Sequence, residues 1–327
     1  MEEPEPELEQ YVSQLPFGGR IKYFLRNWEL ITSDPVILGI VRGYHLDLMT
    51  MPVQQTLPRC CIKQSESQEV SKLLGEFVNR GIIEYASSVP DEFISSIFTR
   101  PKPDGRLRVI LNLKPFNLFI NYVHFKMDSI YSALRLMSPR CYMASIDLTD
   151  AYFSVPVALA HRKFLRFEFQ GKLLQFTCLP MGLKSSPLVF TKLLKPVYSS
   201  LRRKGFMSVA YIDDSYLQGA TEAECHRNVV ETRQLLESLG FVISEKKSVF
   251  NPAQKITFLG FVLDSRSMTV SLTKQRTDKI LSACELALSS EEVLIHAVAT
   301  LLGRMVSSFV AIPIGRLYSR SLEADKI

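Results

Sequence analysis

The stretch Tyr211-Ile212-Asp213-Asp214 places two adjacent carboxylates between apolar runs, at residues 206–210 and 216–217, that both predict short strands. Holding two like charges at a tight turn between strands is costly unless a cation neutralises them. Ligation by oxygen atoms alone suits a hard divalent ion such as Mg²⁺. The four residues leave a second interpretation open, because an Asp-Asp pair also suits the tip of an ordinary solvated hairpin. A third carboxylate elsewhere in the chain would favour the metal site.

Asp147 is that third carboxylate, at the end of the apolar run 142–146, which predicts a largely buried strand. A carboxylate at a strand end is well placed to share cations with carboxylates at the end of a second strand. Helix N-capping is the alternative role, and we favour it for Asp150. Two Mg²⁺ ions about 3.5–4 Å apart, or Mn²⁺ in their place, are the recurring device for in-line nucleotidyl transfer. We therefore predict that Asp147, Asp213 and Asp214 are catalytic metal ligands.

The overall composition limits the classes of protein to consider. The 327 residues suffice for two or three subdomains, and 46% hydrophobic with 22% charged residues is ordinary for a globular protein. A formal net charge of +6 permits a polyanionic partner. Residues 1–10 are rich in Glu and predict a disordered tail, so the rest of the chain is more basic than the total.

Cysteine usage and hydropathy indicate the compartment. The six cysteines are scattered, without a CxxC pair or a His at zinc-ligand spacing, as in reduced intracellular proteins. The N-terminus lacks a basic-then-apolar signal peptide, and no apolar run approaches the roughly 18–20 residues of a membrane span. We therefore predict an intracellular protein of the cytoplasm or nucleus without a membrane partner. The sequence does not predict the oligomeric state.

Strands interleaved with helices, without strict alternation, predict an α+β fold rather than a doubly wound sheet. Residues 11–58 show no sustained period and predict an irregular arm with a short helix near 23–31. Further helices are predicted at 70–78, with Gly81 after the helix end, and at 128–137, 185–204, 222–239 and twice within 273–310. Strands are predicted at 93–99, 107–113, 142–148, in a hairpin at 164–176, around Asp213-Asp214, and at 258–263 and 268–271. The last two are expected to complete a mixed sheet.

Residues that would suit a triphosphate lie in two turns. The first is the turn of the 93–113 hairpin, where a period of two places two arginines on one face. The second is the loop 179–187, which precedes a helix and exposes backbone N–H groups to an anion or a base. A solvated hairpin tip and a plain helix-capping loop are the alternatives. The candidates are Lys102, Arg106 and Arg108 in the first turn, and Met181, Gly182 and Lys184 in the second.

These stretches resemble, in order and spacing, the core motifs of reverse transcriptases. The matching stretches are Asp147 with Asp150-Ala151-Tyr152, the loop 179–187, Tyr211 to Asp214, the hairpin 101–108 running on to Asn112 and Asn117, Gly240 with Lys246-Lys247, and Phe258-Leu259-Gly260. The resemblance covers roughly residues 45–270. It implies an RNA-directed DNA polymerase domain of a retroelement, with a right-hand fold of fingers, palm and a partial helical thumb.

The resemblance also implies a role for each candidate. Asp147 and Asp213 would be the principal metal ligands, with Asp214 assisting and the Leu148 carbonyl completing the shell. Tyr152 would lie under the deoxyribose and select dNTPs. The six triphosphate candidates would contact the nucleotide, and Lys246 or Lys247 would lie near the pyrophosphate as a proton donor. Phe258, Leu259 and Gly260 would grip the primer strand. The implied partners are an RNA/DNA template-primer and dNTPs.

Alternatives stay open for some of these residues. Tyr152 also suits a packed core, and Lys246-Lys247 suits a solvated charge pair. Met181 stands where many members of the family carry a polar residue, often Gln. Thioether packing would replace a hydrogen bond to the nucleotide sugar there.

By the same resemblance the chain divides into subdomains. The expected divisions are an N-terminal arm at 1–44, fingers at 45–125, the first part of the palm at 126–152, a fingers/palm insertion at 153–190, the palm at 191–270, and a partial thumb or connection at 271–327. None of the carboxylates within 271–327 follows an apolar strand, so we expect no RNase H site there.

Further interpretations concern the origin and the activity of the chain. Residues 24–28, 31–35 and 43–44 resemble the segment that precedes this domain in tyrosine-recombinase (DIRS-group) retrotransposons. A truncated remnant that binds nucleic acid without catalysis is the alternative to an active polymerase, as is part of a longer polyprotein. The last alternative is an unrelated intracellular α+β scaffold whose motifs are coincidental.

Overall fold

The computed structural model describes residues 14–58, 62–101, 105–290 and 292–324. It divides into two compact units. Unit 1 takes the described residues of Met1–Met127, Leu148–Ser200 and Thr232–Ser244, and unit 2 takes those of Asp128–Asp147, Leu201–Glu231 and Glu245–Ile327. The predicted disordered tail, residues 1–10, lies outside the described residues. None of the described helices combines the length and apolarity that crossing a bilayer requires.

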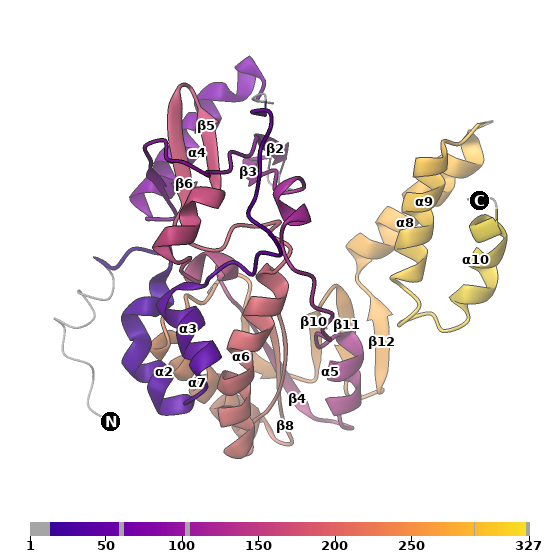
Figure 1. The fold of residues 1–327 in the computed structure, drawn as a ribbon. Helices are drawn as coiled ribbons and strands as arrows, with labels where there is room; N and C mark the ends of the chain where they lie inside the picture. The colour runs from indigo at the N-terminus through magenta and orange to yellow at the C-terminus, as the bar shows by residue number, and fades with distance from the viewer. Residues whose placement is uncertain (1–13, 59–61, 102–104, 291, 325–327) are drawn as a thin grey trace. The chain divides into compact units, whose positions relative to one another are not determined.

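Unit 1 combines helices with a three-stranded antiparallel sheet of order β1-β6-β5 and a separate hairpin β2-β3 (Figure 1). Its strands are β1 (Ile83–Tyr85), β2 (Ile97–Pro101), β3 (Leu107–Leu111), β5 (Arg166–Phe169) and β6 (Lys172–Phe176). Its helices are α2 (Leu25–Ile31), α3 (Pro35–Gly43), α4 (Ser67–Asn79) and most of α6 (Ser186–Arg203). Its 3-10 segments are η1 (Arg20–Phe24), η2 (Gln64–Glu66), η3 (Phe116–Leu118), η4 (Ala151–Ser154) and η5 (Leu159–Phe164).

Unit 2 is built on a four-stranded antiparallel sheet of order β7-β8-β4-β9. These strands are β4 (Tyr142–Asp147), β7 (Met207–Tyr211), β8 (Asp214–Gly219) and β9 (Val249–Ala253). A second antiparallel sheet contains β10 (Lys255–Phe258), β11 (Phe261–Asp264) and β12 (Thr269–Leu272). The helices are α5 (Ile130–Leu136), α8 (Lys274–Ser289), α9 (Ile295–Val306) and α10 (Gly315–Ala324), and α7 (Glu222–Ser238) is divided between the units.

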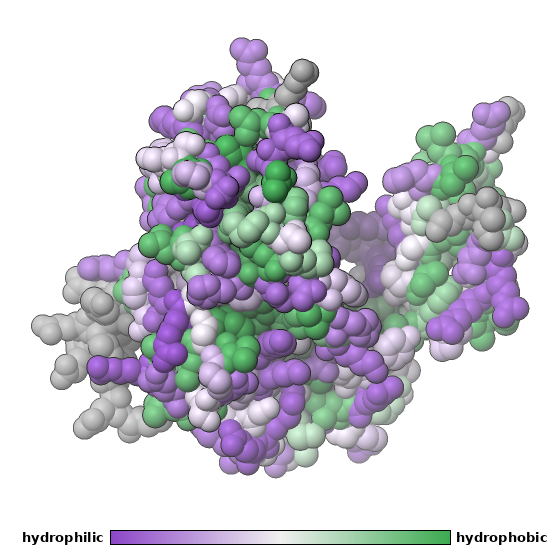
Figure 2. All heavy atoms as spheres, in the orientation of Figure 1, coloured by the Kyte–Doolittle hydropathy of each residue, from purple (hydrophilic) through white to green (hydrophobic). Residues whose placement is uncertain are grey.

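An apolar cluster joins the two sheets of unit 2. Met143 and Tyr216 from the first sheet pack with Ile256, Phe258 and Leu263 from the second. The ring centroids of Tyr216 and Phe258 lie 5.7 Å apart. By contrast, Leu286, Leu294 and Ile295 stay exposed on or beside α8 and α9, where Figure 2 shows apolar side chains at the surface. The cluster ties β10 and β11 to the strand that begins at Asp214.

The end of α4 agrees with the prediction. Arg80 is the C-cap, and Gly81 follows with a φ of 67°, a left-handed conformation that glycine adopts without strain. The Gly81 N–H donates to Val78 O and the Ile82 N–H to Phe77 O, both at 2.9 Å, so the Schellman pattern satisfies the last carbonyls of the helix.

Two local predictions are wrong. Residues 35–43, predicted as irregular, form α3, because the Asp34 carboxylate accepts the Val36 N–H at 2.8 Å and Pro35 fits the first helical turn. The single strand predicted at 258–263 is two strands, because Leu259 and Gly260 have φ of 47° and 77° and turn the chain back. With β12 these strands form their own sheet rather than completing a mixed one.

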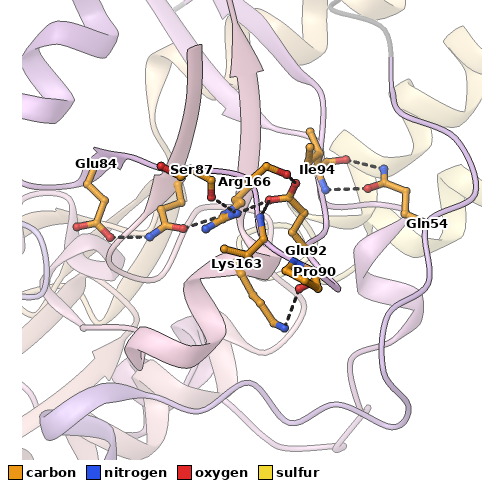
Figure 3. Close-up of polar contacts among 11 residues, drawn as sticks. Gln54, Glu84, Ser87, Pro90, Glu92, Ile94, Lys163 and Arg166 are labelled. Atoms are coloured by element: carbon orange, nitrogen blue, oxygen red, sulfur yellow. Dashed lines mark hydrogen bonds and ion pairs between the residues drawn. The ribbon is translucent and has the colours of Figure 1, made fainter. Parts of the chain in front are cut away.

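A buried ionic network holds the β1-β6-β5 sheet to the loop that follows β1 in unit 1 (Figure 3). Arg166, only 5% exposed, donates to Gln175 Oε1 at 2.9 Å, to the Ser87 carbonyl at 3.0 Å, and to the Glu92 carboxylate. Burial would raise the pKa of Glu92, but hydrogen bonds from Ser88 and Arg166 outweigh it and lower that pKa. Gln54 adds two hydrogen bonds to the backbone of Ile94 beside the network.

Candidate active site

The Tyr211 to Asp214 stretch forms the tight hairpin that its sequence predicts. Tyr211 and Asp214 are paired residues of β7 and β8, so Ile212 and Asp213 alone connect the strands. Ile212 has a φ of 54°. A two-residue hairpin turn needs left-handed backbone there, which costs a β-branched residue on the order of 1–3 kcal/mol. The paired strands fix the turn despite this cost, and they hold Asp213 at its tip.

Asp147 lies beside this hairpin, at the end of β4. In the register of β4 and β8 it is directly opposite Asp214. Opposed residues of an antiparallel pair project from the same face of the sheet, so both side chains share that face. Asp147 is 8% exposed. Two strands that are distant in sequence therefore bring one buried carboxylate beside the Asp-Asp turn.

The charges of the cluster oppose one another. Burial first, then the charges of Asp213 and Asp147, raise the pKa of Asp214 to about 6. The pKa of Asp213 is also raised, by burial first and then by Asp147. Lys247 opposes both shifts. Three carboxylates in one region are thus only partly compensated by the charges of the protein, which is the condition that a cation relieves.

A buried oxygen of Asp147 also fits a cation. Within the described part of the chain, Asp147 Oδ1 accepts no hydrogen bond. Lys247 Nζ lies 3.3 Å from it as an ion pair, and the hydrogen bond of this ammonium goes to Oδ2 at 3.4 Å. In the described residues no three His, Cys, Asp or Glu side chains converge closely enough to hold a metal ion as they stand. The donor set therefore fits a hard cation by its chemistry, but the side chains would have to move together to share one.

The repulsion of Asp214 by Asp213 and Asp147 leads to a pH-dependent prediction for the protein stripped of divalent ions with EDTA. The pKa of Asp214 is about 6 in the folded chain and near 3.8 ordinarily. The stability that this group contributes is therefore fully present below pH 3.8 and is lost as the pH rises through 6. Asp214→Asn is neutral at every pH. It should melt about 2–4 °C above the wild type at pH 7.5, the shift for roughly 1 kcal/mol of screened repulsion. At pH 4 the two melting temperatures should coincide. A gain of the same size at both pH values, in thermal melts followed by circular dichroism, would contradict this.

The two lysines predicted as a pair separate in the structure. Both are exposed, but Lys247 is the one that contacts Asp147, and the Asp147 N–H donates to the Ser248 hydroxyl next to it at 3.0 Å. Ser248 was not a sequence candidate. A serine directly before a strand carries no local signal, and only the pairing of β9 with β4 brings its hydroxyl to Asp147.

The three predicted primer-grip residues differ in burial and in their contacts. Phe258 is 2% exposed and packs on Tyr216, so its side chain is unavailable to a nucleic acid. Leu259 and Gly260 form the turn between β10 and β11 and are half-buried. A Cβ added to Gly260 would lie 3.2 Å from an Arg276 guanidinium nitrogen, and this guanidinium also covers the Phe261 ring at 4.4 Å. Arg276 is a cation at this turn that the motif did not indicate.

In unit 1, the loop around Gly182 is held by a residue that was not a site candidate. Asn117 donates to Gly182 O at 2.9 Å and accepts the Lys184 N–H at 2.8 Å. The Lys184 ammonium donates to the Ile120 carbonyl at 3.0 Å and lies over the Tyr122 ring. The Lys184 N–H and the Lys184 ammonium thus each donate a hydrogen bond within the protein. Met181 is half-buried beside them.

The remaining unit 1 candidates also have defined surroundings. Tyr152 lies in η4, edge-on to the buried Phe190 ring at 5.6 Å between centroids. Leu148 is buried and bridges to Ile243. Asp150 stands at the N-cap of η4, but its side chain makes no capping hydrogen bond, and its carboxylate pairs with Arg80 at 2.9 Å. The capping role favoured for Asp150 is wrong.

The basic hairpin differs from its prediction at Arg100 and at Arg106. Arg108 is exposed on β3 directly opposite Arg100 of β2, a cation that the motif did not indicate. The strand begins at Leu107, so Arg106 precedes it and the two-residue period does not fix its face. Lys102 lies outside the described residues. Two like charges opposed across a hairpin are unfavourable unless an anion lies between them.

Comparison with known proteins identifies the segment that holds most of these residues. Residues 101–263 match the family described as reverse transcriptase (RNA-dependent DNA polymerase). They form a reverse transcriptase domain. The match contains the Asp147 strand, the Gly182 loop and the Asp213-Asp214 turn, in the order in which the sequence analysis placed these motifs.

Relatives of the reverse transcriptase domain include viral polyproteins. The Gag-Pol polyprotein of Avian reticuloendotheliosis virus is 28% identical over 283 residues, which are 84% of this chain and 23% of that polyprotein. The chain thus spans less than a quarter of that relative. Among solved structures, a foamy viral protease-reverse transcriptase in complex with ds DNA has a TM-score of 0.67 at 22% identity, covering 84% of this chain and 47% of that one. Another, in complex with RNA/DNA hybrid, has a TM-score of 0.65 at 21% identity over 85% and 36%. The fold is that of the polymerase-like reverse transcriptases, with antiparallel sheets and helices as predicted.

Proposed function

We propose that this chain is an RNA-directed DNA polymerase domain that extends a primer by nucleotidyl transfer. The observation that carries the proposal is the register that sets Asp147 opposite Asp214, beside Asp213, within the reverse transcriptase match. Carboxylates so placed, with raised pKa values for the two at the turn, suit a site that handles cations and phosphates.

We assign Asp147, Asp213 and Asp214 as the residues that would hold two Mg²⁺ ions, or Mn²⁺. When bound, such ions lower the pKa of an attacking hydroxyl and stabilise the leaving pyrophosphate. The buried Asp147 carboxylate supplies an oxygen that accepts no hydrogen bond from the described residues. Asp213 and Asp214 supply charge that the rigid turn keeps at one place.

We assign the template-primer and dNTPs as partners. The related foamy viral enzymes were solved with dsDNA and with an RNA/DNA hybrid, which supports the class of ligand. Lys102, Arg106 and Arg108 remain our candidates for the triphosphate, and Arg100 joins them because it faces Arg108. The Leu148 carbonyl, the Met181-Gly182 turn, and Lys246 or Lys247 as proton donor keep their assigned roles, and so do the fingers, palm and thumb divisions. For the primer strand we retain Leu259 and Gly260.

Primer extension tests the proposal. The purified chain is mixed with an annealed DNA primer on an RNA template, dNTPs and Mg²⁺, and products are resolved on a sequencing gel. Full addition of templated nucleotides supports a polymerase. Binding of the template-primer in a gel shift without any extension would instead support the non-catalytic remnant, and absence of both would contradict the proposal.

Tyr152 gives a prediction about sugar selection. Its ring is held edge-on against buried Phe190, so it presents a fixed steric surface. Tyr152→Val should lower the preference for dNTPs over rNTPs by about 10- to 100-fold, the usual value of a few missing carbon atoms in a binding pocket. Single-nucleotide incorporation kinetics measure the ratio. Tyr131→Val, at an exposed tyrosine of α5, is the matched control and should leave the ratio unchanged. Equal ratios in all three proteins would remove Tyr152 from the site.

We also propose that the chain derives from a tyrosine-recombinase (DIRS-group) retrotransposon. Residues 24–28, 31–35 and 43–44 support this origin by their resemblance to that group. Sequencing the genomic DNA beyond the codon for residue 327 tests it: a tyrosine recombinase frame in the same element is expected. An integrase frame in its place would reject this origin and leave the polymerase assignment untouched.

An intracellular location, in the cytoplasm or nucleus, is our proposal for the compartment. The buried thiols Cys141, Cys178 and Cys225 are unpaired, as in a reducing environment. Burial raises the pKa of Cys178 to about 12, so this thiol stays protonated and inert. Imaging of a tagged chain should show it within the cytoplasm or nucleus, and recovery from the medium would contradict the assignment.

A further inference from the structure

Two consecutive residues of unit 2 contact Asp147 from its two ends. The Ser248 hydroxyl accepts the Asp147 backbone N–H at 3.0 Å. Lys247 Nζ lies 3.3 Å from Asp147 Oδ1 and 3.4 Å from Oδ2. Lys247 lies 100 positions after Asp147 in the sequence, and Ser248 lies 101 positions after it. The pairing of β9 with β4 brings them there, so the arrangement is a product of the sheet rather than of local sequence.

The ion pair is asymmetric in a way that makes it easy to open. The side chain of Lys247 is 68% exposed, whereas that of Asp147 is 12% exposed. An exposed ammonium regains its hydration when it leaves, so a pair of this kind contributes little to stability. The Asp147 carboxylate cannot leave, because it stands on a strand paired on both sides. A competing cation would therefore displace the lysine and keep the carboxylate.

We propose that Lys247 is a resident counter-ion of Asp147 that a divalent cation displaces, and that Ser248 is a positioning residue for Asp147. The inference rests on the proposed function, because it takes Asp147 as a ligand of the divalent ion. Lys247 neutralises a carboxylate that the turn carboxylates would otherwise repel. An ammonium and a divalent ion on the same carboxylate repel each other, so loading of the ion and release of Lys247 occur together.

Equilibrium binding of Mn²⁺ to the EDTA-stripped chain tests the counter-ion. Free Mn²⁺ is followed by electron paramagnetic resonance, without nucleic acid or nucleotide. Lys247→Met should bind Mn²⁺ about two- to fivefold more tightly than Lys246→Met, since an exposed pair is worth little more than this. The adjacent Lys246 is the matched control, because its substitution removes the same charge one residue away. Equal or weaker binding by Lys247→Met would overturn the proposal.

Displacement has a second readout in the reactivity of Lys247 itself. Brief acetylation with an N-hydroxysuccinimide ester, followed by peptide mass spectrometry, reports each free amine. Modification of Lys247 should rise several-fold when Mn²⁺ is added, while that of Lys246 should stay constant. Unchanged reactivity of Lys247 at saturating Mn²⁺ would overturn the proposal even if the affinities differ.

Ser248 is tested by rescue. Ser248→Ala leaves the Asp147 N–H without its acceptor and should weaken Mn²⁺ binding by about fivefold. Ser248→Thr keeps the hydroxyl and should restore the Mn²⁺ affinity. If the side chain served only to fill space, the hydroxyl of threonine would not restore this affinity. Equal weakening in both variants would overturn the positioning role.

The failure of this inference is distinguishable from failure of the proposed function. Asp147→Asn should abolish the Mn²⁺ site in both the wild-type and the Lys247→Met backgrounds. If Mn²⁺ binding depends on Asp147 but Lys247→Met equals Lys246→Met, the counter-ion alone is rejected. If Mn²⁺ does not bind, or binds independently of Asp147, both the ligand assignment and the counter-ion are rejected.

Discussion

Replacing Asp213 with Asn should reduce primer extension by at least about 10³-fold while leaving the chain folded. The amide keeps the size of the side chain but removes the charge that would hold a divalent ion. Metal-assisted charge stabilisation is worth several kcal/mol, and each 1.36 kcal/mol is a factor of ten in rate. Single-turnover extension on an RNA template, at saturating dNTP, measures the loss.

The same substitution should not lower the melting temperature of the metal-free chain. Burial and the charge of Asp147 raise the pKa of Asp213, so its ionised form is destabilising at neutral pH and removing it relieves repulsion. Asp278→Asn is the matched control, because Asp278 is an exposed carboxylate of α8 and undergoes the same chemical change. Retention of more than a tenth of wild-type activity by Asp213→Asn would remove Asp213 from the catalytic centre.

Replacing Arg166 with Met should lower the free energy of unfolding of unit 1 by about 3–5 kcal/mol. The guanidinium is buried and satisfies Gln175, the Ser87 carbonyl and the Glu92 carboxylate together (Figure 3). Its loss leaves Glu92, whose side chain is 15% exposed, without its cation. Removing one partner of a buried ion pair costs this much because the remaining charge is buried without compensation. Urea unfolding followed by the fluorescence of Trp28, the one tryptophan and fully buried in unit 1, measures the change.

Two comparisons make this result specific. Arg42→Met, in an exposed pair with Glu29, should cost no more than about 1 kcal/mol. The double change Arg166→Met with Glu92→Met should recover much of the loss, since a buried pair replaced by apolar residues is often neutral.

The pKa of Glu92 is lowered by folding, so the stability that this carboxylate contributes is present above pH 4.5 and is lost as the pH falls through the folded pKa. The gap between wild type and Arg166→Met should therefore shrink in acid, and a gap independent of pH would contradict the ionic origin.

The sequence predicted the parts of the site that depend on neighbours in the chain. An apolar run ending at Asp147, an Asp-Asp pair between two short strands, and Gly81 after a helical period are signals within a few residues, and the structure confirms the elements they predict. The errors at 35–43 and 258–263 were also local. Asp34-Pro35 is a helix-start signal within a segment that has no sustained period, and Leu259-Gly260 is a turn signal inside an otherwise apolar run.

Other assignments required the partners of each side chain. Lys246 and Lys247 are indistinguishable in sequence, yet only Lys247 contacts Asp147. Phe258 looks like an exposed motif residue but is a core residue against Tyr216. Lys184 looks free for an anion, but its ammonium donates to the Ile120 carbonyl. Each of these outcomes depends on a contact between residues far apart in the chain.

By itself, the sequence determined which residues carry charge at strand ends and turns, and hence the class of chemistry, because residue type and short-range period are local properties. Only the tertiary structure decided that Asp147 lies opposite Asp214, that Lys247 and Ser248 meet Asp147, and that Asn117 holds the Gly182 loop. These contacts follow from strand register and packing between distant segments. A shift of one residue in the register of β4 and β8 would turn one of the two carboxylates to the opposite face of the sheet, and nothing in the local sequence excludes such a shift.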